Sequence, residues 1–165
     1  LDILDRVGDR FDLVRLVVDI DVELFFQRHE KLCLVQRIRP EVIEMTPRTA
    51  QAARDRGLAV HIGDAVSEEV LLHAGLNETC LVVITIPDPR MTISIIEAIK
   101  RLAHKSPVVA RCRYHIFRDD MEKAGAHLVV DEENMVGMDL AEAVIDSLRQ
   151  ADSEEMACAI GISGV

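Results

Sequence analysis

The sequence has few positive charges: 19 lysines and arginines stand against 29 aspartates and glutamates, and the net charge is −10. This balance argues against non-specific nucleic-acid binding, which needs clustered cations to neutralise phosphates. It also argues against adsorption to an anionic lipid surface. A local anion site remains open, and Arg111 and Arg113 are its candidates.

Long apolar runs are also missing, and no uncharged run approaches the length that a membrane span needs. No secretory signal is visible and the chain begins at Leu1, so we expect a processed chain or a fragment of a longer protein. The four cysteines are scattered without metal-ligand spacing, which indicates reduced, buried thiols in a cytosolic protein. Cys112, between two arginines, is the one candidate for a redox role. No Ser-His-Asp order or metal-ligand pattern is found.

Residues 41 to 130 repeat one unit, namely a short apolar strand, a turn marked by glycine or proline, and an amphipathic helix. Strands that alternate with helices predict an α/β fold with a parallel sheet and helices on both faces. The expected strands are 42–44, 58–62, 81–86, 108–110 and 127–130, and the expected helices are 47–56, 67–74, 90–104, 116–124 and a last helix around 138–148.

The two ends of the chain follow this pattern less clearly. In residues 1–40 the helical spacing of Leu4, Val7, Phe11 and Val14 gives way to strict alternation around Val18, so we expect a helix and then a strand that starts near residue 16. The regular domain then covers 41–149, and residues 150–165 are expected to form a tail.

Polar and small residues follow four of the expected strands, at the edge where parallel sheets bind ligands. Glu44 is placed to accept hydrogen bonds from a ribose diol, or is an ordinary solvated acid. The loop of Gly63, Asp64 and Ala65 permits close approach of a ligand, or is a turn with a helix cap. Thr85 is placed to face a ligand, and Arg111 has a planar fork suited to phosphate or carboxylate.

Two further interpretations concern residues next to these positions. Asp88 is expected to cap the helix after the third of these strands rather than leave its N-terminus open to phosphate. Arg111 and Arg113, two residues apart on an extended segment, are expected to point the same way and to bind an anion or form an interface. The acidic run Asp131, Glu132 and Glu133 is expected to be a solvated face.

In this order the motifs resemble the TrkA-N or RCK domain, which regulates potassium channels, Trk-type uptake systems and Kef-type cation/proton antiporters. The resemblance covers residues 41 to about 148 and depends on the segments Gly63-Asp64-Ala65, Ala74-Gly75-Leu76, Thr85-Ile86-Pro87-Asp88-Pro89, Ala110-Arg111-Cys112-Arg113 and Ala124-Gly125-Ala126. It implies a Rossmann-like fold that binds NAD(H), AMP, ADP or ATP without turning it over, and that pairs into dimers or rings at the cytoplasmic face of the transporter in the cell membrane.

By the same resemblance, Glu44 holds the ribose, Asp64 and Ala65 lie near the adenine, Thr85 borders the cleft, and Arg111 meets phosphate or the partner subunit. The family's G-x-G-x-x-G loop is absent here, since no glycine lies between Gly8 and Gly57. These glycines let the backbone approach a pyrophosphate.

Three hypotheses therefore stand. The first is a nucleotide-sensing regulatory domain of a potassium transport system. The second is a non-binding oligomerisation module of such a transporter, which the absent glycine loop favours. The third is a fragment of an NAD-dependent oxidoreductase. Apolar residues of the helices 90–104 and 116–124 are expected to be exposed and to form a homodimer.

Overall fold

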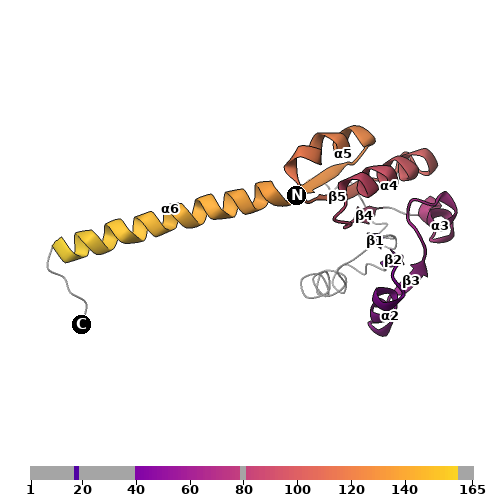
Figure 1. Cartoon of the computed structure of the whole chain (residues 1–165), viewed down its shortest axis with the longest axis horizontal. Coiled ribbons are helices and arrows are strands. Elements are labelled where there is room, and N and C mark those ends of the chain that lie inside the picture. Colours follow the sequence, from indigo (N-terminus) through magenta and orange to yellow (C-terminus); the bar gives the residue numbers. More distant parts are fainter. Residues whose placement is uncertain (1–16, 19–39, 79–80, 160–165) are drawn as a thin grey trace, which may run out of the picture.

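The computed structural model describes residues 17–18, 40–78 and 81–159, and within them the strands form one six-stranded parallel sheet (Figure 1). Its order is β3-β2-β1-β4-β5-β6. The direction of winding therefore reverses between β1 and β4, which is where such sheets open a ligand crevice. The strands are β1 (Val17–Val18), β2 (Glu41–Glu44), β3 (Ala59–Ile62), β4 (Val82–Ile84), β5 (Val108–Cys112) and β6 (Leu128–Asp131).

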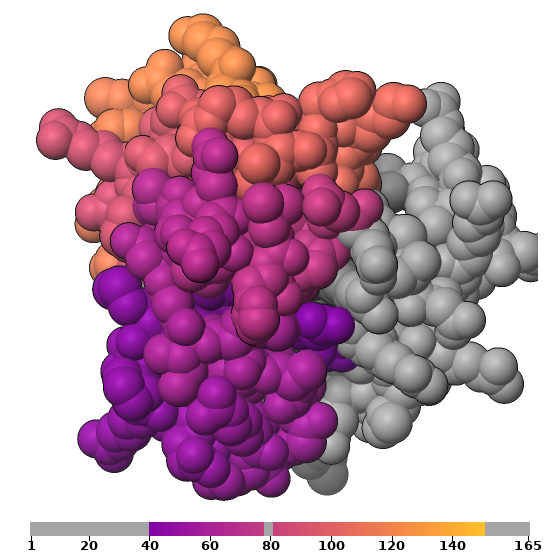
Figure 2. Space-filling model, turned by 90° about the vertical axis from the view of Figure 1, so that its right-hand side faces the viewer, coloured from indigo at the N-terminus to yellow at the C-terminus, as the bar shows by residue number. Residues whose placement is uncertain are grey.

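From β2 onward helices connect the strands, and they lie on both faces of the sheet, as the sequence predicted. Ile43 belongs to the core beneath α3, α4 and α5, whereas the neighbouring Val42 points to the opposite face, on the side of α2. Figure 2 views the β3 edge, where β3, α2 and α3 lie below α4 and α5 in one continuous surface. The helices are α2 (Pro47–Asp55), α3 (Glu68–His73), α4 (Pro89–Leu102), α5 (Arg118–Ala124) and α6 (Glu132–Ala159), with short 3-10 turns η1 (Leu76–Glu78) and η2 (His115–Phe117).

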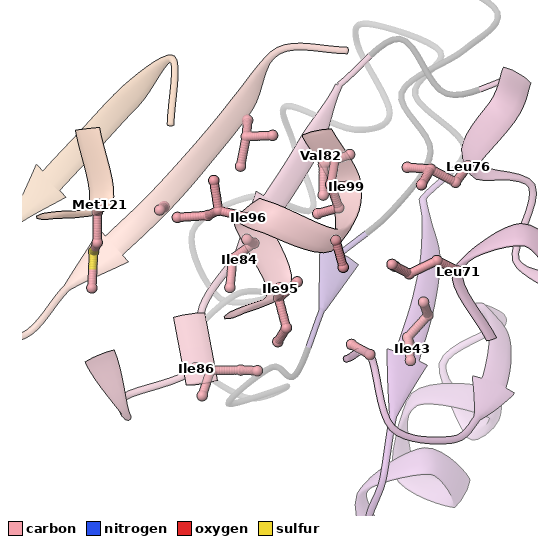
Figure 3. Close-up of a cluster of buried hydrophobic side chains, with 14 of the residues drawn as sticks. Ile43, Leu71, Leu76, Val82, Ile84, Ile86, Ile95, Ile96, Ile99 and Met121 are labelled. Carbon is pink, nitrogen blue, oxygen red and sulfur yellow. The ribbon is translucent and has the colours of Figure 1, made fainter. Parts of the chain in front are cut away.

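Helix α4 supplies the centre of the hydrophobic core (Figure 3). Its apolar residues recur every three or four positions, so one face of the helix meets β4 and β5. Ile95, Ile96 and Ile99 are fully buried there. The expectation that helix 90–104 exposes its apolar residues for a dimer is therefore wrong, because the sheet already covers them. The same expectation also named the segment 116–124, and there Ile116 is indeed 79% exposed.

The N-terminus of α4 is capped as predicted. The Oδ1 atom of Asp88 accepts hydrogen bonds from the backbone N–H groups of Arg90 and Met91, both at 2.9 Å. These contacts satisfy two donors of the first helical turn, which otherwise have no partner in the helix. A carboxylate already occupies this helix end, so the loop before α4 is not an open phosphate site.

Helix α6 is longer than the sequence predicted, since it begins at Glu132 and continues through the expected tail to Ala159. Residues 150–159 contain good helix formers and no proline, and the first glycine beyond them is Gly161. The helix leaves the body directly after β6 and projects away from it (Figure 1). Among the described residues, no helix combines the length and apolarity of a membrane span.

Strand β1 confirms the predicted strand near residue 16, and it lies in the middle of the sheet between β2 and β4. Val17 pairs with Val42 on one side and with Val83 on the other. The predicted helix from Leu4 to Val14 lies outside the described residues. Because β1 lies between β2 and β4, its carboxyl end lies where the winding reverses, which is where parallel sheets bind ligands.

Candidate functional site

A small hollow of about 30 Å³ lies at the carboxyl ends of β2, β3 and β4. Three of the predicted site residues, Gly63, Asp64 and Ala65, are part of its wall. The described lining does not include Thr85 or Arg111, although Ile86 follows Thr85 directly. The lining residues are Ile43, Met45, Gly63, Asp64, Ala65, Ile86 and Met91.

Glu44 lies in the sequence between Ile43 and Met45, which both line this hollow, and only 3% of its surface is exposed. Its Oε1 atom accepts a hydrogen bond from the backbone N–H of Thr46 at 2.6 Å. Its Oε2 atom is buried and accepts no hydrogen bond within the described part of the chain. A buried carboxylate oxygen without a donor is costly, so this atom is suited to a donor that a ligand brings.

The loop after β3 explains the positions of Asp64 and Ala65. The Oδ1 atom of Asp64 accepts a hydrogen bond from Val66 N at 2.9 Å, and its backbone oxygen accepts one from Ser67 N at 3.0 Å. Asp64 therefore forms a turn that leads into α3, which is one of the two roles predicted for this loop. The Asp64 side chain is exposed beside the hollow, while Ala65 is buried. The turn therefore also permits the other predicted role, the close approach of a ligand.

Gly63 is required by close packing rather than by an unusual backbone angle. A Cβ atom at this position would lie 2.8 Å from Cγ2 and 3.0 Å from Cγ1 of Val70, on α3. Its backbone N–H donates to the carbonyl oxygen of Glu44 at 3.2 Å, which ties the ends of β2 and β3 together. The glycine thus holds α3 close to the wall of the hollow.

We expect Gly63→Ala to lower the free energy of unfolding by about 1–3 kcal/mol, the usual range for overpacking. The stiff, branched Val70 side chain cannot move aside easily. Urea unfolding would measure the change. The double variant Gly63→Ala/Val70→Ala should recover part of the loss, whereas an equal or larger loss in the double variant would contradict this packing explanation.

Thr85 and Arg111 meet at the neighbouring strand ends. Arg111 Nη1 donates to the backbone oxygen of Thr85 at 3.2 Å, and Nη2 donates to Glu132 Oε2 at 3.2 Å. Arg111 Nε also donates to Glu132 Oε1, so the ion pair is bidentate. The structure therefore gives Arg111 an acidic partner on α6. Arg113 follows the end of β5 at Cys112, and its guanidinium lies 5.5 Å from the ring centre of Tyr114.

The acidic run at the start of α6 is a cluster of contacts rather than a solvated face. Asp131 is buried, and its carboxylate contacts the His115 ring and accepts a hydrogen bond from Asn134 N at 3.0 Å. The hydrogen bond from His115 holds the pKa of Asp131 below its usual value, although desolvation opposes this. Glu133 accepts a hydrogen bond from His115 N at 2.7 Å. Sequence reasoning did not predict this cluster. The cluster forms because β5 and β6 are neighbours in the sheet, which brings Asp131 close to the end of β5.

Cys112 is not a redox candidate. Its side chain is fully buried, and its thiol donates to the backbone oxygen of Tyr114 at 3.0 Å. Burial, followed by the charge of Asp131, raises the pKa of the thiol. A buried thiol with a raised pKa is a poor nucleophile, so Cys112 fits the predicted buried, reduced thiol rather than the redox alternative.

A larger hollow of about 340 Å³ lies on the β3 edge, between β3 and α3. It contains none of the predicted site residues, and its histidines already serve packing. His61 Nε2 lies 3.0 Å from Glu41 Oε2, and its ring meets His73 edge to face, with ring centres 5.6 Å apart. Within the described residues no three histidine, cysteine or acidic side chains could hold a metal ion. The smaller hollow at the strand ends is therefore the better candidate site.

Comparisons with known proteins agree with this fold. The K(+) efflux antiporter 1, chloroplastic, of Arabidopsis thaliana is 28% identical over 164 residues, which cover 90% of this chain and 14% of that protein. The chain thus spans a small part of that relative's length. The TrkA-N domain of the Escherichia coli inner membrane protein ybaL superposes with a TM-score of 0.68 at 22% identity, covering 79% of this chain and 95% of that one.

A second solved structure, the Shewanella denitrificans Kef CTD in AMP-bound form, superposes with a TM-score of 0.62 at 19% identity. It covers 92% of this chain and 99% of the other. At these identities the two superpositions establish the Rossmann-like fold. The family model described as the TrkA-N domain matches residues 32–132, more than half of the sequence. The chain therefore belongs to the TrkA-N domain family.

Proposed function

We propose that this chain is a nucleotide-sensing regulatory domain of a potassium channel or cation/proton antiporter, and that its ligand shifts the assembly state without being consumed. Membership of the TrkA-N family and the similarity to a K(+) efflux antiporter support this proposal. The observation that carries it is the buried Oε2 atom of Glu44, which has no donor in the described part of the chain and belongs to the residue between Ile43 and Met45 of the hollow.

The residues suit the adenosine half of a nucleotide. A ribose diol supplies two adjacent O–H donors, which match the carboxylate of Glu44. The adenine ring lies against the apolar side chains of Met45, Ala65 and Ile86, and its amino group donates to Asp64. The missing G-x-G-x-x-G loop removes the usual support for a pyrophosphate, so AMP is the preferred candidate, ahead of ADP, ATP and NAD(H).

Unfolding of the purified chain with and without AMP, ADP, ATP, NAD⁺ and NADH tests the proposal. A ligand at about 100 times its dissociation constant adds about 2.7 kcal/mol to the free energy of unfolding. We expect this gain with AMP, and we expect Glu44→Gln to remove most of it because the diol loses its charged acceptor. Glu69→Gln, an exposed acid on α3, is the matched control and should keep the full gain.

The same experiment separates the two other hypotheses. A folded sample that none of these nucleotides stabilises would rule out sensing by this chain and favour the oligomerisation module. Reduction of NAD⁺ by the chain with an added substrate would favour the oxidoreductase instead. Persistence of the AMP gain in Glu44→Gln would show that the ligand binds elsewhere.

The partners that we propose are a second copy of this chain and a membrane-embedded potassium channel or transporter, on the same or another polypeptide. The chain would then lie in the cytoplasm at the inner face of the cell membrane. The exposed apolar face of α6 supports the second copy. Met138, Ile145 and Leu148 follow one another at helical spacing and remain at least half exposed.

A second observation supports the same pairing. Leu128 and Val130 are exposed on β6, on the sheet face that α4 and α5 do not cover. A doubly wound sheet normally buries both faces, yet the helix that follows β6 projects away from the body (Figure 1). Each chain thus offers an unpartnered helix and an open strand face, and a two-fold dimer can cover both.

A further inference from the structure

Arg111 contacts both helix α6 and Thr85, which lies at the end of β4 next to the candidate cleft. One nitrogen of its guanidinium, Nη1, donates to the backbone oxygen of Thr85, the residue before Ile86 of the hollow. The other two nitrogens donate to the two carboxylate oxygens of Glu132, the first residue of α6. A planar guanidinium binds a phosphate with the same fork of donors that it uses for a carboxylate.

Helix α6 is held to the body at its first turn. Three consecutive acids make contacts at this junction: Asp131, the last residue of β6, contacts the His115 ring, Glu132 contacts Arg111 of β5, and Glu133 accepts from the His115 backbone N–H. Farther along, the apolar residues of α6 lie exposed, as Leu148 shows at 61%. The direction of the helix therefore depends on these contacts, and Arg111 is the partner that also contacts Thr85, the residue before Ile86 of the hollow.

We propose that the Arg111–Glu132 ion pair couples the cleft to α6: the phosphate of a bound nucleotide competes with Glu132 for Arg111 and loosens the first turn of the helix. This inference rests on the proposed nucleotide site. The side chains of Arg111 and Glu132 are 31% and 38% exposed, so water screens their attraction and the pair can be exchanged for another anion. Binding and helix release are then reciprocal, so removing Glu132 strengthens phosphate binding.

Binding of AMP and of adenosine to the full chain, measured by calorimetry, tests the coupling. Glu132→Gln should bind AMP about two- to fivefold more tightly, the range of a partly exposed ion pair, and should bind adenosine as the unchanged chain does. Arg111→Gln should weaken AMP binding, and Glu132→Gln should have no further effect in its background. Glu142→Gln, on the exposed side of the same helix, is the matched control.

Hydrogen exchange provides a second readout. We expect AMP, and not adenosine, to speed amide exchange in residues 133–137 of the unchanged chain, and we expect no such change in Glu132→Gln. Equal AMP affinity in both chains together with unchanged exchange would overturn the coupling while leaving the proposed function intact. Failure of AMP, adenosine and the other nucleotides to bind a folded sample would overturn the proposed function, and the coupling with it.

Discussion

Replacement of Ile96 by alanine is expected to lower the free energy of unfolding by about 3 kcal/mol, within the range of about 2–5 kcal/mol for such changes. Ile96 is fully buried at the centre of α4 and lies near Ile84 and Met121 (Figure 3). The substitution removes three carbon atoms from a close-packed core and leaves a cavity that the rigid sheet beneath cannot fill. Equilibrium unfolding in urea at a fixed protein concentration would measure the loss.

Ile116→Ala is the matched control for this experiment, since the same atoms are removed from a side chain that is 79% exposed. Its effect should stay within about 0.5 kcal/mol. A change of similar size in both variants would mean that Ile96 is not in a packed core. If Ile96→Ala lowers the free energy of unfolding only slightly, the core around α4 must relax to fill the cavity.

The second large effect is expected at α6, where Ile145→Glu/Leu148→Glu should convert a dimer into a monomer. Two carboxylates on the apolar face would have to be buried without partners in a paired helix, and this costs several kcal/mol. We expect the dissociation constant of the dimer to rise more than about a hundredfold, the equivalent of about 2.8 kcal/mol. Sedimentation velocity over a range of concentrations would measure it.

Asp139→Asn/Glu142→Gln changes the opposite, charged side of α6 and should leave the dimer intact. Because the acids of α6 lie mainly on this side, two paired helices keep them in water. A monomeric unchanged chain at about 100 µM would contradict the dimer that we propose. If only Asp139→Asn/Glu142→Gln dissociates the dimer, the contact lies on the charged side of α6 and not on the apolar side that we propose.

Local sequence signals predicted most of the fold, because they depend on neighbouring residues. The alternation of strands and helices, the cap at Asp88 and the approximate position of β1 all follow from spacing and from residue type. The apolar face of α4 was also recognised, but the sheet that covers this face was not. Periodicity shows which residues share a face, and only the sheet topology shows what covers that face.

The structure brings some of the predicted site residues together, but their contacts were less predictable. Gly63, Asp64 and Ala65 share the wall of one hollow, and Glu44 lies in the sequence between two of its lining residues. The partner of Arg111 was not foreseen, since Glu132 lies 21 residues away and comes near only because Cys112 pairs with Asp131 in the sheet. Long-range pairs of this kind depend on strand order and register, which no short motif encodes.

The junction between β6 and α6 has a mechanical consequence. Asp131 ends the strand and Glu132 begins the helix, so no loop separates the sheet from a helix of 28 residues. At 1.5 Å per residue such a helix is about 42 Å long. A rotation of about 5° at its base moves its far end by about 4 Å, so the rearrangement that we propose beside Arg111 would be amplified along the length of the helix.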